Sequence, residues 1–519
     1  MGIVFLFFSC QKERIDTVTT DDCNSEISDG TPYFQSVADF NNVIEEVKSG
    51  ITNYDKDGWV SRAEYLKQRK LIALSSMNLK SAGIDESQIN VEDSVVKDPY
   101  LLQLLNDKRE VQIGDDVYKI TDLGLFECPP ERLNDLRYLL TQESFKEVVR
   151  QKLLDWKATH SLKSAAMVAP IESESVPIDQ DIIMILPEEP ISGGGGGTST
   201  GGSSSDPIFL ENATMNSCDE SNKTLAGEII AGVVGYSVNC ENNFTSSKRV
   251  KTVFWAQNWF FYSSVGIKVK MQSKVLGVWF QKDAQELHLG WEKIRYKLKT
   301  SILPEIATLR INSDVFNTHL SDIFSSWSSF VAFCNKFHVD ISKSPTFAQL
   351  HQQLVENSFK EWQYRTVRYY NNDFADLVWY IKHGDYDKFK VYLEGTATKT
   401  ALNFLKSKLD PATKDELEQH QQRKENISFT FVDENFNVER VLMPQESASE
   451  GFNTNKIEKI LDYDSGALAV AVGLNGSTPF YGVKLYKAPI SYEILKGSSI
   501  FGVAKYENSW RGSRIEKMN

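Results

Sequence analysis

The oxygen-bearing side chains of residues 53–64 have types and spacing that suggest metal chemistry. Asn53, Asp55 and Asp57 are followed at once by Gly58, and Glu64 comes seven residues after Asp57. Amide and carboxylate oxygens at the first, third, fifth and twelfth positions of a loop, with glycine at the sixth, suit the ligand shell of Ca²⁺. The stretch is therefore an imperfect candidate calcium loop.

This spacing resembles the loop of EF-hand proteins but departs from it in three ways. The first position is Asn rather than Asp, Ser49 and Gly50 interrupt the incoming helix, and no second loop pairs with the first. A lone imperfect match is a common false positive of this motif. We therefore prefer a polar loop before a helix, assign no metal ligand and expect no cofactor, with calcium as the alternative.

Patterns typical of catalysis are missing from the sequence. There is no HExxH, no Walker A loop, no GxSxG and no GxGxxG, and the seven histidines are scattered. Cys334 and His338 lie four residues apart and could share a helix face as a thiol and base, but a buried Cys beside a surface His is the preferred interpretation. No catalytic residue is assigned, and we lean against an enzyme.

Residues 362–392 combine many aromatic residues with four interspersed aspartates, Asp373, Asp376, Asp385 and Asp387. Aromatic platforms with paired carboxylates are features of glycoside hydrolases. Most of the aromatics, however, recur at spacings of three and four, which indicates helix packing. We prefer helices and keep an envelope glycan hydrolase as the alternative function.

Residues 248–274 form a basic and aromatic cluster. Such a mixture can bind an anionic glycan or a single-stranded nucleic acid by stacking and charge. Lys268 and Lys270 alternate with apolar residues, so the preferred interpretation places them on the solvent face of a half-buried strand. The cluster comprises Lys248, Arg249, Lys251, Trp255, Trp259, Phe260, Phe261, Tyr262, Lys268, Lys270 and Lys274.

The N-terminus, MGIVFLFFSCQKER, has a short apolar run that ends at Ser9 and Cys10. The run is too short to span a bilayer. FFSC resembles a bacterial lipobox, and the following QKE resembles the surface-export signal of lipoproteins of the Bacteroidota. The resemblance implies lipidation at Cys10, attachment to the membrane through that lipid, and a place in the outer membrane, facing the cell surface.

A second stretch, REVQIGDDVYKIT at residues 109–121, resembles one found in uncharacterised exported proteins of the Bacteroidota. That resemblance covers about the N-terminal half and implies no activity. Its apolar residues alternate on both sides of Gly114 and Asp115, which predicts a β-hairpin.

Six cysteines are present, and Cys218 and Cys240 flank an apolar stretch. In an exported protein this pair could close a disulfide. At least one of Cys23, Cys128 and Cys334 would then stay unpaired.

The net charge is −13, and the excess acid lies in the first 200 residues. This balance gives no overall attraction to phosphate backbones, so nucleic acid is not expected as a partner. A glycan or another envelope protein is the expected partner, and the expected role is binding or scaffolding.

The Gly- and Ser-rich residues 192–205 divide the chain into two halves, because such residues bury nothing and prefer no backbone conformation. We expect the halves to move independently, with the apolar residues 182–186 adding a strand to one of them.

Periodicity predicts an α+β protein with a small, mainly helical N-terminal domain containing one hairpin, a flexible Gly/Ser linker, and a larger α+β domain. The expected divisions are a signal remnant and tether at 1–32, the helical domain at 33–166, the linker at 167–207, and the α+β domain at 208–519, made of a β-meander (208–300), a helical block (301–425) and further strands (426–519).

Overall fold

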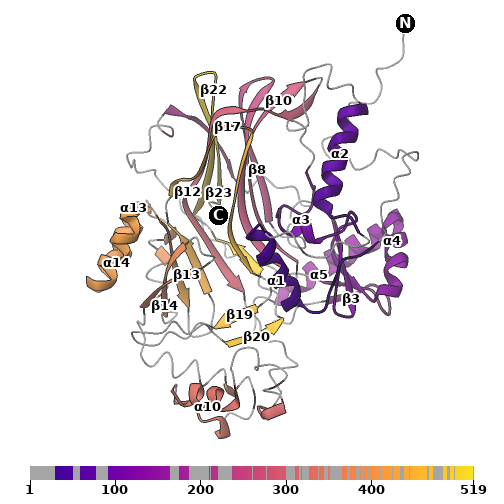
Figure 1. The fold of residues 1–519 in the computed structure, drawn as a ribbon, viewed down its shortest axis with the longest axis vertical. Coiled ribbons are helices and arrows are strands. Elements are labelled where there is room, and N and C mark those ends of the chain that lie inside the picture. Colours follow the sequence, from indigo (N-terminus) through magenta and orange to yellow (C-terminus); the bar gives the residue numbers. More distant parts are fainter. Residues whose placement is uncertain are drawn as a thin grey trace.

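The structure is a computed structural model of a mixed α and β protein in which strands predominate (Figure 1). It describes residues 30–50, 59–76, 92–163, 175–185, 210, 212–219, 236–259, 261–275, 277–299, 310–314, 317, 326–336, 338–343, 346, 349–350, 353, 365–370, 374–380, 386, 390–391, 393–394, 398–409, 411–423, 425–432, 438–443, 445–464, 467–470, 483–487, 491–495 and 497–517.

The helices lie mostly in the N-terminal part and around residues 400–420. The helix α1 begins after Ser36, whose hydroxyl accepts a hydrogen bond from the Asp39 amide, and it buries Phe40 and Ile44. The helices are α1 (Val37–Lys48), α2 (Arg62–Ser76), α3 (Leu101–Leu104), α4 (Leu133–Thr141), α5 (Glu143–Lys163), α10 (Trp327–Lys336), α13 (Thr398–Ser407) and α14 (Pro411–Gln422), with short 3₁₀ turns η3 (Pro130–Arg132) and η5 (Ile341–Lys343).

The N-terminal part is built on a six-stranded sheet. The hairpin expected at residues 109–121 is present, with Gly114 at a positive φ in its turn. In residues 33–163 the helices hold more residues than the strands, but the one expected hairpin is part of a larger sheet, because short apolar strands extend it. The strands run in the order β1 (Tyr33–Phe34), β2 (Glu110–Ile113), β3 (Asp116–Thr121), β4 (Gly124–Cys128), β6 (Ile183–Ile185) and β5 (Ser175–Pro177).

The strand expected at residues 182–186 is confirmed as β6, which pairs with β4 of this sheet. Residues 175–185 therefore belong to the N-terminal part, although the sequence suggested a linker from residue 167. The Gly- and Ser-rich residues 192–205 lie outside the described residues.

A five-stranded sheet contains most of the expected meander. Its strands are β8 (Tyr236–Thr245), β9 (Lys248–Asn258), β10 (Ser263–Val275), β11 (Val278–Gln281) and β18 (Lys456–Asp464), and β18 pairs with β10.

A ten-stranded sheet faces it, centred on the 16-residue β12. Strand β12 pairs with β22, so the C-terminal strands join the strands of the expected meander. The strands are β7 (Thr214–Asp219), β12 (Ala284–Lys299), β13 (Arg365–Tyr370), β14 (Phe374–Tyr380), β15 (Asn426–Val432), β16 (Val438–Leu442), β17 (Gln445–Thr454), β21 (Ser491–Ile494), β22 (Ser498–Tyr506) and β23 (Ser509–Lys517), while β19 (Ala467–Val470) and β20 (Val483–Lys487) form a separate ribbon.

The helical interpretation of residues 362–392 is wrong, because this stretch contains β13 and β14. Leu377 and Trp379 point to one face, where α13, α14 and the strands share a core, and Asp376 is buried on the opposite face. This is a period of two, so the three- and four-residue spacing of the aromatics did not reflect a helix.

The two large sheets are joined at both edges. On one side the consecutive strands β17 and β18 connect them, since β17 pairs with β12 and β18 pairs with β10. On the other side β7 and β8 are linked by the Cys218–Cys240 disulfide, with 5.6 Å between the two Cα atoms. The Asn242 side chain also donates hydrogen bonds to the carbonyls of Thr214 and Gly512. The disulfide expected from the sequence is thus present, and Cys128 and Cys334 are free and buried.

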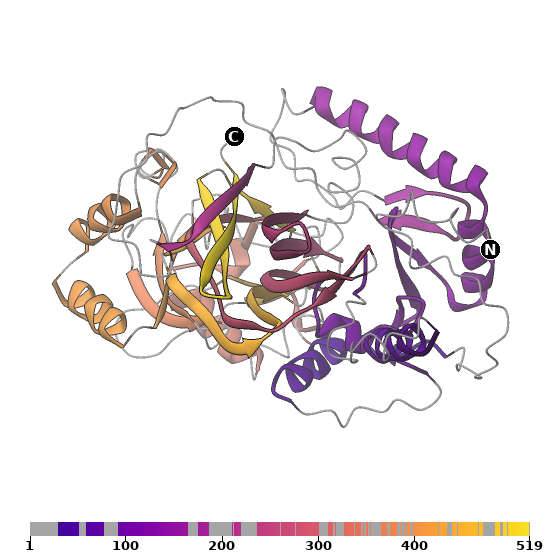
Figure 2. The same cartoon turned by 90° about the horizontal axis from the view of Figure 1, so that it is seen from above.

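The turn between β9 and β10 inserts into the N-terminal part. Trp259, Phe261 and Tyr262 belong to the same buried core as the six-stranded sheet. The Phe261 ring lies 5.3 Å from the rings of both Phe40 and Tyr118, centroid to centroid. The view from above shows the N-terminal elements beside the long strands (Figure 2). The expectation that the two halves move independently is therefore wrong, because they share a core.

We predict that Phe261→Ala lowers the free energy of unfolding by about 3–5 kcal/mol, because it leaves a cavity in this shared core. Urea denaturation followed by tryptophan fluorescence measures the change. Phe452→Ala is the matched control: its ring is 61% exposed, so its effect should stay within about 0.5 kcal/mol. Equal effects of the two substitutions would contradict the shared core.

We also predict that reducing the Cys218–Cys240 disulfide lowers the free energy of unfolding by about 3 kcal/mol, since the bond closes a loop spanning 22 residues. Denaturation with and without a thiol reductant measures this. A Cys218→Ser/Cys240→Ser variant should be less stable than the oxidised protein and insensitive to the reductant. A wild-type protein indifferent to reduction would contradict the prediction.

Candidate binding surface

The outer face of the five-stranded sheet carries cations and indoles in alternation with the core residues. On β9, Val250 and Phe254 face the core that lies between the large sheets. Because successive side chains alternate between faces, Arg249, Lys251 and Trp255 point outward, and the same rule applies along β10. We call this surface the cation–indole face and define it by Arg249, Lys251, Trp255, Lys268, Lys270, Lys274, Trp279 and Lys456.

At its outer end the face has a half-exposed indole surrounded by cations. The guanidinium carbon of Arg249 lies 4.0 Å from the centre of the Trp279 ring, and the Lys274 ammonium lies 5.7 Å from it. Arg249 also donates to Gln272 at 2.9 Å and to Glu241. Lys274 is exposed. This end therefore presents an aromatic surface beside an accessible positive charge.

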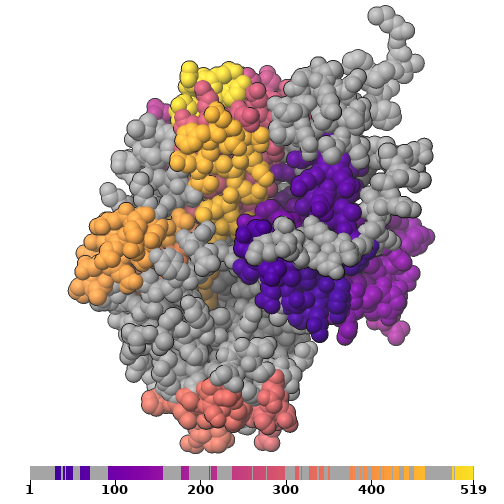
Figure 3. Space-filling view, viewed as in Figure 1, coloured from indigo at the N-terminus to yellow at the C-terminus, as the bar shows by residue number. Residues whose placement is uncertain are grey.

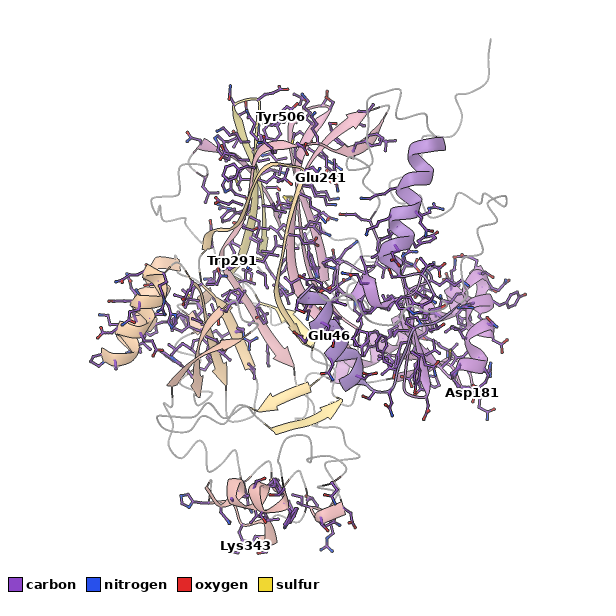
Figure 4. All side chains as sticks on the ribbon, in the orientation of Figure 1. Glu46, Asp181, Glu241, Trp291, Lys343 and Tyr506 are labelled. Atoms are coloured by element: carbon purple, nitrogen blue, oxygen red, sulfur yellow. A yellow bond between two sulfur atoms is a disulfide. The ribbon has the colours of Figure 1, made fainter. Side chains whose placement is uncertain are left out.

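A second aromatic and cationic pair lies at the same end of the strands, on β9 and β22. The Lys248 ammonium is 4.4 Å from the centre of the Tyr506 ring and 2.9 Å from Glu507. Figure 4 labels Glu241 and Tyr506 near the same end of the long strands.

The middle of the face is a row of lysines. Lys251 on β9 and Lys456 on β18 are both directly opposite Lys270 on β10. Like charges placed directly opposite each other destabilise a sheet. The row therefore requires nearby anions. The Glu241 carboxylate lies 3.5 Å from the Lys251 ammonium, and the Glu92 carboxylate contacts Lys270.

The inner end of the face is covered by the N-terminal part. The Lys268 ammonium lies 5.5 Å from the Trp255 ring centre, 2.9 Å from Glu458 and 3.7 Å from Glu92. Gly266 is required here, because a Cβ at this position would lie 2.2 Å from the Trp255 ring.

Residues 92–98 cover the base of the face. The side chain of Gln257 accepts a hydrogen bond from the Lys97 amide at 2.8 Å and donates one to the Val95 carbonyl at 2.6 Å. The Tyr262 hydroxyl donates to Asp98 at 2.9 Å. In the space-filling view the N-terminal residues lie directly beside the strands β17 and β18 (Figure 3).

Lys268 and Lys270 are buried, which corrects the expectation that they lie on a solvent face. The alternation along β10 was interpreted correctly, but the outward side is covered by residues 92–98. Both lysines are less than 9% exposed. The residues of one strand do not indicate that a segment about 170 residues away covers its polar face, so this burial could not be predicted from the sequence.

The electrostatics of these groups follow from burial and pairing. Burial lowers the pKa of Lys270 to about 8, although Glu92 acts in the opposite direction. Burial would raise the pKa of Glu92, but Lys268 and Lys270 hold it well below its usual range. Glu92 is therefore a carboxylate at any pH near neutral.

Among the other candidate residues that the structure describes, Asp376 does not lie on this surface. Asp376 is buried and accepts hydrogen bonds from Ser428 and from Thr430, the latter at 2.8 Å, so it links strands β14 and β15. Asp373, Asp385 and Asp387 lie outside the described residues.

Cys334 and His338 do not share a helix face, because α10 ends at Lys336. Burial raises the pKa of the Cys334 thiol to about 12, which disfavours the thiolate that a nucleophile needs.

The calcium-like loop is described only at its end. The Glu64 carboxylate accepts hydrogen bonds from the Ser61 amide at 3.3 Å and the Ser61 hydroxyl at 3.0 Å, so it helps to cap α2. Asn53, Asp55 and Asp57 lie outside the described residues, as does Cys10. Within the described ranges, no group of three or more His, Cys, Asp or Glu side chains is arranged to hold a metal ion.

Sequence reasoning found five of the cations on this face but missed Glu92, Trp279 and Lys456. Trp279 lies on β11 and Lys456 on β18, and the pairing of these strands with β10 is known only from the tertiary structure. Glu92 has no sequence signal at all, because its partners lie more than 170 residues away.

No protein-family model, no curated protein and no solved structure matches this chain. None of the helices in the described part of the chain is both long and apolar enough to cross a membrane. A functional assignment therefore depends on the chemistry of the surface itself.

Proposed function

We propose that this protein is a lipid-anchored, surface-facing protein of the bacterial outer membrane that binds an anionic glycan on the cation–indole face. The observation that carries the proposal is the lysine row beside the partly exposed Trp279, since Trp255 at the inner end of the face is buried. Flat aromatic surfaces offer stacking for sugar rings, and the ammonium groups attract acidic substituents.

The charge of the whole chain favours a glycan over a nucleic acid. A net charge of −13 repels a long polyphosphate, whereas a shorter acidic oligosaccharide experiences mainly the local field of the face. The face offers cations and rings suited to binding, so we propose binding or scaffolding rather than hydrolysis.

Two features support a place in the cell envelope. The FFSC sequence places Cys10 where a lipobox has its acylated cysteine. The Cys218–Cys240 disulfide is of a kind that persists in oxidising compartments.

We propose the following finer organisation of the chain. Residues 1–32 form the anchor and tether, the part beginning at residue 33 carries the six-stranded sheet, a Gly- and Ser-rich linker follows, and residues 208–519 carry the binding face. The shared core would present both parts to the ligand as one body.

We predict that the purified full chain binds oligogalacturonate and that Trp279→Ala and Lys456→Gln each weaken binding about fivefold or more, because they remove the stacking surface and a lysine of the row. Isothermal titration calorimetry measures the dissociation constants.

Two controls define this experiment. Methyl-esterified oligogalacturonate has the same rings without the charge and should bind more weakly, and Lys343→Gln should not change affinity, because Lys343 is 77% exposed and far from the face (Figure 4). Release of reducing ends would contradict the binding role, and tighter binding of a single-stranded oligonucleotide of equal charge would contradict the glycan.

We predict that Cys10→Ala moves the protein from the membrane to the soluble fraction of cells, because lipid attachment supplies the stable anchoring. Fractionation followed by immunoblotting measures the shift. Cys334→Ala is a matched control that should stay with the membrane. Unchanged membrane partitioning of Cys10→Ala would contradict the anchor.

A further inference from the structure

The lysine row has more positive charge than its own sheet neutralises. Three carboxylates of the described residues, those of Glu92, Glu241 and Glu458, form ion pairs with the cations of the face, which are Arg249, Lys251, Lys268, Lys270 and Lys456. Two of these carboxylates belong to the sheet itself: Glu241 lies on β8 and Glu458 on β18. The third comes from outside the sheet.

Glu92 approaches the row from the N-terminal part. It lies 3.7 Å from Lys268 and contacts Lys270, and its side chain is 34% exposed. The two lysine side chains are only 10% and 2% exposed. Glu92 is therefore more exposed than the two lysines that it pairs with, and an external anion that reaches Lys270 would compete with its carboxylate.

The backbone beside Glu92 is fixed independently of its carboxylate. The next residue, Asp93, is fully buried as a side chain and pairs with Arg62 at 2.6 Å and with Arg109 at 2.7 Å. Asp93 also accepts hydrogen bonds from the amides of Val95 and Val96. Because these contacts hold the segment, the Glu92 side chain can rotate away from the lysines without displacing residues 93–98.

We infer that Glu92 is a built-in competitor for the anion-binding site formed by Lys251, Lys270 and Lys456. The inference rests on the proposed binding function and names its ligand class, an oligomeric carboxylate. A ligand carboxylate replaces the Glu92 carboxylate on Lys270, so the lysine row exchanges one carboxylate for another.

The competitor selects for oligomers over single acidic sugars. Lys274, beside Trp279, is four residues along β10 from Lys270, which corresponds to about 13 Å. A monomer cannot span that distance, so it must displace Glu92 without gaining the contacts at the outer end. A chain of acidic sugars gains both sets of contacts together.

The test compares oligogalacturonate binding by the wild type and by Glu92→Gln, which keeps the shape of the side chain and removes its charge. We expect about fivefold tighter binding by the variant, because the lysines lose their internal anion. Monomeric galacturonic acid should also gain affinity for the variant, so the selectivity for the oligomer should fall.

The control for net charge is Glu143→Gln, which makes the same charge change on α5, where the side chain is 71% exposed. It should leave affinity unchanged. Thermal unfolding of each variant shows whether it is folded. Glu92→Asp keeps the charge but shortens the reach to Lys270, so it should show a smaller gain in the same direction.

The outcomes separate the two proposals. Equal affinities of wild type and Glu92→Gln overturn the competitor and leave glycan binding intact. Absence of binding by wild type, Glu92→Gln and Glu92→Asp overturns the proposed function. Unfolding of both Glu92 variants overturns the competitor, because it would show that the carboxylate is required to hold the structure.

Discussion

The insertion of the β9–β10 turn into the N-terminal core is the interaction on which the described arrangement depends. Trp259, Phe261 and Tyr262 are almost fully buried there, although they lie on the longest hairpin of the other half of the chain. Burying large aromatic side chains is among the strongest contributions to folding. This insertion sets the position of residues 92–98, and so it determines which part of the cation–indole face remains open.

On the cation–indole face, strand pairing brings like charges close together. Strand pairing places Lys251, Lys270 and Lys456 opposite one another, an arrangement that costs stability unless anions are nearby. Glu92 supplies an anion from the neighbouring part, while Glu241 supplies one from the edge strand. Buried charge pairs often contribute little net stability, which agrees with our proposal that the row of lysines binds an anion.

The two ways in which the large sheets are joined explain why the face can tolerate this charge. The disulfide at one edge and the connection from β17 to β18 at the other hold the sheets over a continuous apolar core. This core stabilises the two sheets, and on the outward side Trp255, Lys268 and Lys270 are buried as well.

The sequence by itself determined the elements that rest on local periodicity and local bonding. The hairpin at residues 109–121, the strand at 182–186, the meander and the Cys218–Cys240 pair could all be predicted, because alternation and turn chemistry act over a few residues and the paired cysteines lie only 22 residues apart. Residues 365–380 were misassigned, since aromatic residues at short spacings satisfy both periods and only pairing with β15 selects the strand. Tertiary structure alone decided that Lys268 and Lys270 are buried and that Glu92 pairs with them. The residues of a strand do not indicate which distant segment covers its polar face.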